Sequence, residues 1–380
     1  MRGKIKIEME DKKITNNKDT NEEQRKYMLW LHCATGISDV KKRKLMDFFK
    51  SPREVYKCNE KRLILAKVLT EEEIQLIISS RKHFDIEEQL QYMEKHNISF
   101  FLEHDKDYPE KLKNIQNPPF CLFVKGRLPK GKKSVAIVGA RACTNYGRQL
   151  ARKIGKDMAM LGVDVIGGMA RGIDTYGHRG ALEEGGSSYG IMGCGADICY
   201  PYENIEIYEE MTEKGGIISE LPLGSEPRSW NFPKRNRIIS GLSDLVIVVE
   251  ARKKSGSLIT AEYALNQGVD VMAVPGRVTD VLSEGCNSLI RDGAYVFTGT
   301  EDIRDLLKIK NVKKNEILNK VLEKDFEVVY SKTDLVPASL QELADKTGFN
   351  TGKILEILVK LQVEGLIYEP AKNYYARKSI

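Results

Sequence analysis

Short apolar runs rich in β-branched residues, separated mostly by helix-length segments, fill the chain between Ser134 and about Gly299. The runs are SVAIVG, VDVIGG, YGIMG, GIISE, DLVIVVE, VDVMAVPG and AYVF. Strands that are apolar throughout must be covered on both faces, and intervening segments such as YGRQLARKIGKDMAMLG have the length and polarity of covering helices. This alternation is typical of doubly wound proteins. The sequence therefore predicts an α/β domain with a mostly parallel, extended Rossmann-like sheet over residues 99–300.

The flanking segments have different patterns. Residues 1–24 are polar and lack periodicity, which predicts a disordered leader. Residues 25–98 show helical periods, which predict a small all-α domain. Residues 301–324 are charged and are interpreted as a linker, and residues 325–380 follow the order helix, turn, helix and hairpin, the outline of a winged helix. Prolines in DYPEKLKNIQNPPFCLFVKG predict an extended connector leading into the sheet.

Composition narrows the classes of function. The net charge of +6, from 60 basic and 54 acidic residues, is too small to identify a partner by itself. The seven cysteines are scattered without a CxxC pair, so we expect reduced thiols and no metal. Nothing approaches the roughly 20 apolar residues that span a bilayer, and we expect a cytoplasmic protein without membrane contact. The chain has neither GxGxxG nor GxxxxGK[ST], so no nucleotide cofactor is expected.

Glycines and polar residues cluster where the predicted strands end. In an open parallel sheet, ligands bind beyond the carboxyl ends of the strands, where glycine N–H groups and helix N-termini attract anions. An arginine fork at such a position suits a phosphate oxygen pair. The sequence therefore predicts phosphate-binding residues at this rim, namely Gly139, Arg141, Gly168, Arg171, Ser255, Gly256 and Ser257.

Cations and aromatics alternate just before the run DLVIVVE. Cations that hold a nucleic-acid backbone, interleaved with aromatics on which bases stack, are what single-strand binding requires. The predicted contacts here are Arg228, Phe232, Lys234, Arg235, Asn236 and Arg237. Structural alternatives remain open: Trp230 and Phe232 as core residues, and Asn236 and Arg237 as donors to loop carbonyls. The cations at 252–254 fit either a solvated turn or a peripheral contact.

The sequence offers only weak candidates for a set of catalytic residues. His178 is the one histidine within the predicted α/β domain apart from His104 near its start, and no serine or cysteine lies in a nucleophile-elbow context. Asp174, Glu220 and Glu250 fall near strand ends, where helix caps and loop ligands are the commoner use of a carboxylate. We therefore expect a protein that is not an enzyme.

Six consecutive motifs carry a family resemblance. They are IVGARACTNYG, GGMARGIDTYGHRGAL, GCGADICYP, FPKRNRIISGLSD, VVEARKKSGSLITAEYALNQGVDVMAVPG and GCNSLIRDGA. Together they resemble the bacterial DNA-processing protein A (DprA/Smf) family. The resemblance implies a single-stranded DNA-binding protein that acts as a dimer, protects incoming DNA and loads the RecA recombinase during natural transformation, with no catalysed reaction. It also implies a sterile-alpha-motif-like N-terminal domain and a C-terminal winged helix.

The family's binding positions fall on one residue of the predicted rim and on five residues of the segment before DLVIVVE. They correspond to Arg141, Arg228, Phe232, Arg235, Asn236 and Arg237. Two departures concern details: Ala140 replaces the family's usual serine, and Asn231 replaces its usual histidine. In the N-terminal segment, ATGISDVKKRKLM resembles the turn of a helix-hairpin-helix, with Ser38 in place of the second glycine. The alternative for that segment is a partner-binding surface.

Two other functions remain open at this point. Related doubly wound sheets bind nucleotides or hydrolyse nucleoside monophosphates, but the junction ARKKSGSLITAE is basic where such enzymes carry a glycine pair, which leaves Glu262 as a candidate carboxylate. A transcription regulator would read duplex DNA with TGKILEILVKLQVEG, whose Lys353 and Lys360 are few for a groove. For a dimer, we expect an interface around residues 270–300.

Overall fold

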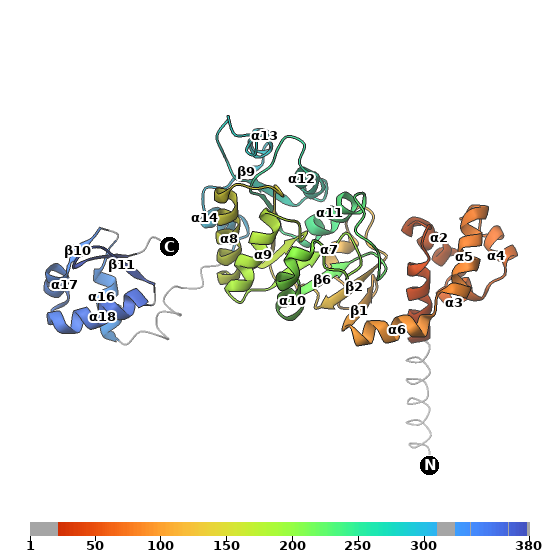
Figure 1. Cartoon of the computed structure of the whole chain (residues 1–380), viewed down its shortest axis with the longest axis horizontal. Coiled ribbons are helices and arrows are strands. Elements are labelled where there is room, and N and C mark those ends of the chain that lie inside the picture. Colours follow the sequence, from red (N-terminus) through yellow and green to blue (C-terminus); the bar gives the residue numbers. More distant parts are fainter. Residues whose placement is uncertain (1–21, 310–323, 335, 364, 378–380) are drawn as a thin grey trace, which may run out of the picture. The chain divides into compact units, whose positions relative to one another are not determined.

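A computed structural model describes residues 22–309, 324–334, 336–363 and 365–377. The chain divides into two compact units, Met1–Lys308 and Ile309–Ile380, and each is described by itself (Figure 1). Most of the predicted leader and residues 310–323 of the predicted linker lie outside the described residues. Residues 22–24 of the leader are helical, and the start of the linker belongs to helix α14 (Thr300–Leu306).

The described part of the first unit contains a nine-stranded sheet in the order β1-β2-β6-β5-β4-β3-β7-β8-β9. Its seven parallel strands correspond to the seven apolar runs and are β3 (Ser134–Val138), β4 (Asp164–Gly167), β5 (Ser188–Ile191), β6 (Gly216–Ser219), β7 (Leu245–Val248), β8 (Asp270–Ala273) and β9 (Tyr295–Val296). All residues of β3 to β7 are buried, as expected for strands covered on both faces. The predicted doubly wound, mostly parallel sheet is confirmed.

Two antiparallel strands extend this sheet, and the sequence prediction did not contain them. β1 (Ile98–Leu102) pairs with β2 (Cys121–Gly126), and β2 pairs with β6. The predicted connector, residues 107–126, is therefore a loop with the short helix α7 (Glu110–Lys113) followed by β2, which lies between β1 at the edge and β6. The prolines lie in that loop, so they interrupt no hydrogen bond of the sheet.

Helices cover both faces of the sheet (Figure 1). They are α8 (Asn145–Met160), α9 (Ile173–Glu183), α10 (Ile205–Lys214), α11 (Asn231–Leu242), α12 (Gly256–Asn266), α13 (Glu284–Arg291) and the 3₁₀ turn η1 (Tyr202–Asn204). Neighbouring residues of β6 show the two faces: Ile217 packs in one core cluster with Met211 of α10, and Ile218 in another with Ile238 of α11. Glycines let α8 and α9 touch, since a Cβ at Gly155 would lie 2.2 Å from the carbonyl oxygen of Gly177.

The N-terminal helices share a core with the sheet. Residues 22–33 form a helix, followed by α2 (Asp39–Phe49), α3 (Pro52–Lys57), α4 (Glu60–Leu65), α5 (Glu71–His83) and α6 (Ile86–Lys95). Trp30 and Leu45 are fully buried among them, and their cluster continues into Phe123 of β2. The segment is helical as predicted and packs as part of the first unit, while its limit at residue 98 stays a prediction.

The second unit has its own core. It contains α16 (Lys324–Lys332), β10 (Ala338–Ser339), α17 (Leu340–Thr347), α18 (Thr351–Val363), β11 (Ile367–Ala371) and β12 (Tyr374–Arg377), with the strand order β10-β12-β11. Leu343, Leu358 and Ile367 are buried in its core. Helices followed by a two-stranded hairpin agree with the predicted order of elements, and the assignment as a winged helix stays a prediction. No helix in the described parts of either unit is long and apolar enough for a bilayer.

Candidate functional site

The direction of winding reverses between β3 and β7. From β3 the chain adds β4, β5 and β6 on one side, and then returns to place β7 on the other side of β3. Loops after two such strands diverge, and the crevice between them is where open α/β sheets bind ligands. A cavity of ≈ 460 Å³ lies at this point. Its lining includes Gly139, Arg141, Asp174, Phe232, Arg235, Asn236, Arg252, Lys254, Ser255, Gly256 and Ser257.

The loop after β3 is fixed by close backbone contacts. The N–H of Ala140 donates to the carbonyl of Glu250 over 2.7 Å. Gly172 has φ +80°, and a Cβ there would lie 2.3 Å from the carbonyl oxygen of Ala140, so the loop after β4 packs directly on the loop after β3. Arg141 is exposed at the crevice, with its guanidinium carbon 5.8 Å from the centre of the Phe232 ring. The cation is thus presented by a rigid turn.

Glu250 supports the start of α8. Its carboxylate accepts from the backbone N–H of Thr144 over 2.9 Å and from the hydroxyl of Thr144 over 2.5 Å. The same hydroxyl caps α8 by accepting from the N–H of Gly147 over 3.0 Å. This carboxylate therefore has the structural, helix-supporting use expected from the sequence.

A buried polar cluster forms the floor beneath Gly168. Asp174 accepts from the N–H of Gly168 over 2.8 Å, and Arg235 donates to the carbonyl of Gly168 over 3.0 Å and to that of Ile191. Burial raises the pKa of Asp174 to about 6 and lowers the pKa of Arg235 to about 10. His178 is buried against Ser188, and burial lowers its pKa to about 3, so its ring is neutral. The floor therefore combines a fixed cation with a carboxylate that titrates near pH 6.

Helix α11 separates the cations that are adjacent in sequence. Lys234 is exposed, as is Arg228 just before the helix, whose guanidinium carbon lies 5.4 Å from the centre of the exposed Trp230 ring. Arg235 and Asn236 are buried, and the Asn236 amide donates to the carbonyl of Gly256 over 3.3 Å. Successive helical residues point in different directions, so the helix exposes Lys234 and buries its neighbours Arg235 and Asn236.

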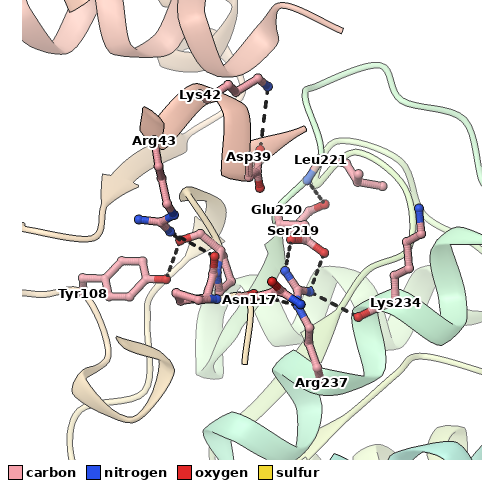
Figure 2. A network of polar contacts seen from close by, with 12 residues as sticks. Asp39, Lys42, Arg43, Tyr108, Asn117, Ser219, Glu220, Leu221, Lys234 and Arg237 are labelled. Carbon is pink, nitrogen blue, oxygen red and sulfur yellow. Dashed lines mark hydrogen bonds and ion pairs between the residues drawn. The ribbon is translucent and has the colours of Figure 1, made fainter. Parts of the chain in front are cut away.

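Arg237 is also largely buried. Its two terminal nitrogens lie 2.7 and 2.5 Å from the carboxylate oxygens of Glu220, and its Nε donates to the carbonyl of Asn117 over 2.9 Å (Figure 2). Both side chains of the ion pair are largely buried, with 11% and 14% exposed. The predicted contact of Arg237 with a phosphate stays a prediction, and the structure gives this residue the alternative role of donor to a loop carbonyl.

The second cationic cluster lies on the other side of the cavity. Arg252, Lys253 and Lys254 are exposed in the loop after β7, and the first and last of them line the cavity. Ser255 caps α12 by accepting from the N–H of Ser257 over 3.4 Å. The N-terminus of this helix therefore faces the cavity with cations beside it, an arrangement that attracts anions.

A small neighbouring cavity adds an aromatic side chain that the sequence prediction missed. It holds ≈ 30 Å³ and is lined by Gly168, Arg171, Tyr200 and Phe232 among others. The Tyr200 ring lies 5.6 Å from that of Phe232. Tyr200 lies shortly after β5, within the motif GCGADICYP, and this position is the signal by which the sequence could have identified it. Arg171 is exposed here and pairs with Glu203 over 2.6 Å.

The fold and this rim define a class: a doubly wound α/β protein with a cationic, glycine-lined crevice suited to a polyanion that carries flat groups. In the described residues, no group of three or more His, Cys, Asp or Glu could hold a metal ion. Residues 99–308 match the family described as DNA recombination-mediator protein A, and the chain belongs to this DprA/Smf family. The family resemblance seen in the sequence is confirmed.

Several relatives are similar over most of their length. The chain is 42% identical to DNA processing protein DprA of Bacillus subtilis over 56% of this chain and 72% of that protein, and 35% identical to protein Smf of Synechocystis over 73% and 70%. The X-ray structure of DNA processing protein A from Streptococcus pneumoniae has a TM-score of 0.62 at 30% identity, covering 75% of this chain and 98% of that one. A Helicobacter pylori structure, which concerns that protein's single-stranded DNA binding mode, has a TM-score of 0.50 at 27% identity over 56% and 95%.

Proposed function

We propose that this protein binds single-stranded DNA in the crevice between β3 and β7. The observation that carries the proposal is the cavity at the switch point, where the exposed Arg141 and the half-buried ring of Phe232 lie together. The single-stranded DNA binding of the Helicobacter pylori relative supports it. Cations for phosphates and a ring face for bases are the two components that single-strand binding needs.

The crevice divides these tasks among its residues. Arg141 lines the cavity, and Arg228 and Lys234 are exposed cations close to Phe232 in the sequence, so all three are the proposed phosphate contacts. The N–H groups at Gly139 and at the start of α12 supply neutral donors to the same chain of phosphates, whereas the N–H of Gly168 already donates to Asp174. Phe232 is reached from within the crevice, and a base that stacks on it must be unstacked from its neighbours. A paired duplex does not offer such a base, so the site favours single strands.

The carboxylates around the cavity support a binding role without a catalysed step. Asp174 accepts from the N–H of Gly168, and Glu250 accepts from Thr144 at the start of α8. Both carboxylates thus hold loops of the rim in place. Hydrolysis of a nucleoside monophosphate would need a carboxylate free to act on the substrate, whereas Asp174, which lines the cavity, accepts from the N–H of Gly168.

Further parts of the proposal rest on the family. The protein would protect incoming DNA in the cytoplasm and pass it to the RecA recombinase during natural transformation, with the C-terminal unit in an accessory role. Two copies would join near residues 270–300, where Val278, Val281 and Tyr295 are exposed and β9 lies at the edge of the sheet. Light scattering should give a dimer at micromolar concentration, and a monomer there and above would contradict this interface.

Fluorescence anisotropy with labelled oligonucleotides tests the proposed function. Single-stranded dT oligonucleotides and a duplex of the same length are titrated at two salt concentrations. We expect tighter binding to the single strand and weaker binding at higher salt, because cation release accompanies phosphate contacts. Equal or duplex-biased binding would contradict the proposal and favour a regulator that uses the C-terminal unit. Turnover of nucleoside monophosphates without DNA binding would favour the enzyme alternative.

A further inference from the structure

The three-residue segment Asn117–Pro119 lies between the N-terminal helices and α11 (Figure 2). Pro118 and Pro119 have no backbone N–H, so the segment mainly offers carbonyl oxygens and needs donors from outside. From the α11 side, Arg237 donates to the carbonyl of Asn117 over 2.9 Å while its guanidinium is paired with Glu220.

Arg43 of α2 holds the same segment from the other side. It donates to the carbonyl of Pro118 over 3.0 Å and pairs with Glu103. Its guanidinium carbon lies 5.5 Å from the ring centre of Phe120, the residue after the segment. The hydroxyl of Tyr108 adds a hydrogen bond of 3.0 Å to the carbonyl of Pro119. Two arginines from separate helices therefore hold one short stretch of chain by its carbonyls.

The position of Arg237 in α11 connects this segment to the DNA site. Arg237 follows Phe232, Lys234 and Arg235 in the same helix, within about one and a half turns. It also donates to the carbonyl of Lys234 over 3.2 Å. A helix moves largely as a rigid body, so a shift at Arg237 displaces the Phe232 ring in the crevice and the exposed Lys234 cation.

We propose that Arg237, Glu220 and Arg43 are positioning residues of the single-strand site, which hold α11 in register through the carbonyls of Asn117–Pro119 and make DNA affinity depend on the placement of α2. This inference rests on the proposed function. Arg237 is then not a phosphate ligand, since Glu220 takes both terminal nitrogens of its guanidinium. The N-terminal helices contribute to DNA binding without touching DNA.

The variant Glu220→Gln distinguishes a positioning role of Arg237 from a direct phosphate contact, because the two roles predict opposite changes in DNA affinity. A phosphate ligand freed from its carboxylate would bind DNA more tightly. If Arg237 is a positioning residue, the loss of its partner should lower the protein's affinity for DNA by about 3- to 30-fold. This is the range seen for residues that act through a network. Tighter binding by Glu220→Gln would overturn the inference.

The salt dependence gives a second, independent readout. For a single strand, each lost phosphate contact lowers the slope of log affinity against log salt by about 0.7. Arg237→Gln and the charge-balanced double variant Arg237→Gln/Glu220→Gln should weaken binding with the wild-type slope. Arg141→Gln, which removes an exposed cation of the crevice, should lower the slope. A lowered slope in the double variant would show that Arg237 contacts a phosphate.

Arg43→Gln tests the N-terminal side of the network, with Arg25→Gln as its matched control. Arg25 also ties the N-terminal helices to the sheet, by an ion pair with Asp105 and a hydrogen bond to the carbonyl of Phe100, both 2.6 Å. Its side chain is 35% exposed, against 32% for Arg43. We expect Arg43→Gln to lower single-strand affinity about threefold or more with the slope unchanged, and Arg25→Gln to leave affinity unchanged. Equal effects of the two variants would overturn the inference.

Two controls keep the outcomes distinct. The fraction of binding-competent protein is measured for each variant by titration at stoichiometric DNA, so that loss of folded protein is not scored as loss of affinity. The wild-type protein is measured first. If it does not bind single strands, the proposed function fails; if it binds and the Glu220→Gln or Arg43→Gln results go the other way, only the positioning role fails.

Discussion

Arg141 and Arg237 were both predicted to contact phosphates, but only Arg141 lines the crevice. Arg141 is exposed at the end of a tight turn, whereas Arg237 is mostly buried against a carboxylate. Sequence reasoning selects both, because both lie in cationic motifs at the rim. It could not distinguish them, since the ion pair depends on Glu220, a residue that only the fold brings to α11.

Arg141→Ala should weaken single-strand binding more than the triple replacement of residues 252–254 by alanine. The Arg141 guanidinium is presented by a fixed turn beside Phe232, so little order is lost on binding, whereas the three cations after β7 are exposed on a loop. We expect a loss of about tenfold for Arg141→Ala, in line with a hydrogen bond to a charged group. Anisotropy titrations measure both variants, and a larger loss in the triple variant would move the site toward the exit of β7.

Phe232→Leu should remove base stacking while the fold is retained. The ring packs over Gly193 and lies near Tyr200, and leucine keeps much of this apolar volume without the π-face. Stacking is worth roughly 1 to 3 kcal/mol per base, so single-strand affinity should fall about tenfold or more. Thermal unfolding should be nearly unchanged. A lower melting temperature with unchanged affinity per folded molecule would make Phe232 a core residue only.

Single-strand affinity should rise as the pH falls from about 7.5 toward 6. Burial raises the pKa of Asp174 to about 6 in the free protein, while the Arg235 and Arg141 cations oppose that shift. A bound phosphate near this carboxylate raises its pKa further, so binding takes up a proton above pH 6 and lower pH favours the complex. Below pH 6 the free carboxyl is already protonated and the gain levels off.

The pH series uses dT oligonucleotides, because thymine does not titrate in this window. Asp174→Asn keeps an acceptor for the N–H of Gly168 and has no carboxyl to protonate. We expect its affinity to be higher than wild type at pH 7.5 and nearly independent of pH. The same pH dependence in both proteins would assign the effect to another group.

At the scale of elements, the parallel strands were predictable and the two antiparallel strands β1 and β2 were not. An apolar run such as DLVIVVE is long enough, and β-branched enough, to identify a buried strand. β1 and β2 are separated by a proline-containing loop of the kind that suggests irregular chain, and their antiparallel pairing depends on β6, which comes much later in the sequence. The sequence shows the apolar residues of β1 and β2, but it does not show that β2 pairs with β6.

Helix α11 explains why the candidate site was only partly predictable. Its segment reads as a continuous cationic cluster, yet Pro233 lies in the first turn, where a missing N–H is tolerated, and the segment is helical from Asn231 onward. The residue at which the helix starts decides which side chains face the crevice. That residue cannot be located from composition, so exposed Lys234 and buried Arg235 looked alike.

Gly172→Ala should disturb both the fold and the site. Gly172 has φ +80°, and an added Cβ would approach the carbonyl oxygens of Ala140 and Arg141 to 2.3 and 2.5 Å. Such strain typically costs 1–3 kcal/mol, so we expect the melting temperature to fall by several degrees and single-strand affinity to drop with it. Gly299→Ala is the control, since a Cβ there meets nothing within 4 Å and its backbone is extended. Equal stability of the two variants would show that the loop after β3 adapts.

At the scale of the whole molecule, the two compact units differ in their features for binding DNA. The first unit contains the crevice, the exposed cations Arg228 and Lys234 and the segment of residues 117–119. The second unit has a helix, α18, whose lysines Lys353 and Lys360 pair with Asp325 and Glu356. Paired cations are weakly suited to grip a phosphate backbone. We therefore expect a fragment of residues 1–308 to retain most of the single-strand affinity.

Cross-linking of a 4-thiothymidine-substituted oligonucleotide, followed by mass spectrometry of the linked peptides, tests the central claim most directly. It reports which residues lie beside the bases in the complex of the full chain. The crevice between β3 and β7 predicts links to peptides that contain Arg141 and Phe232, and the loss of the latter link in Phe232→Leu. Links confined to residues 22–98 or to residues 324–377, with none at the crevice, would contradict the account.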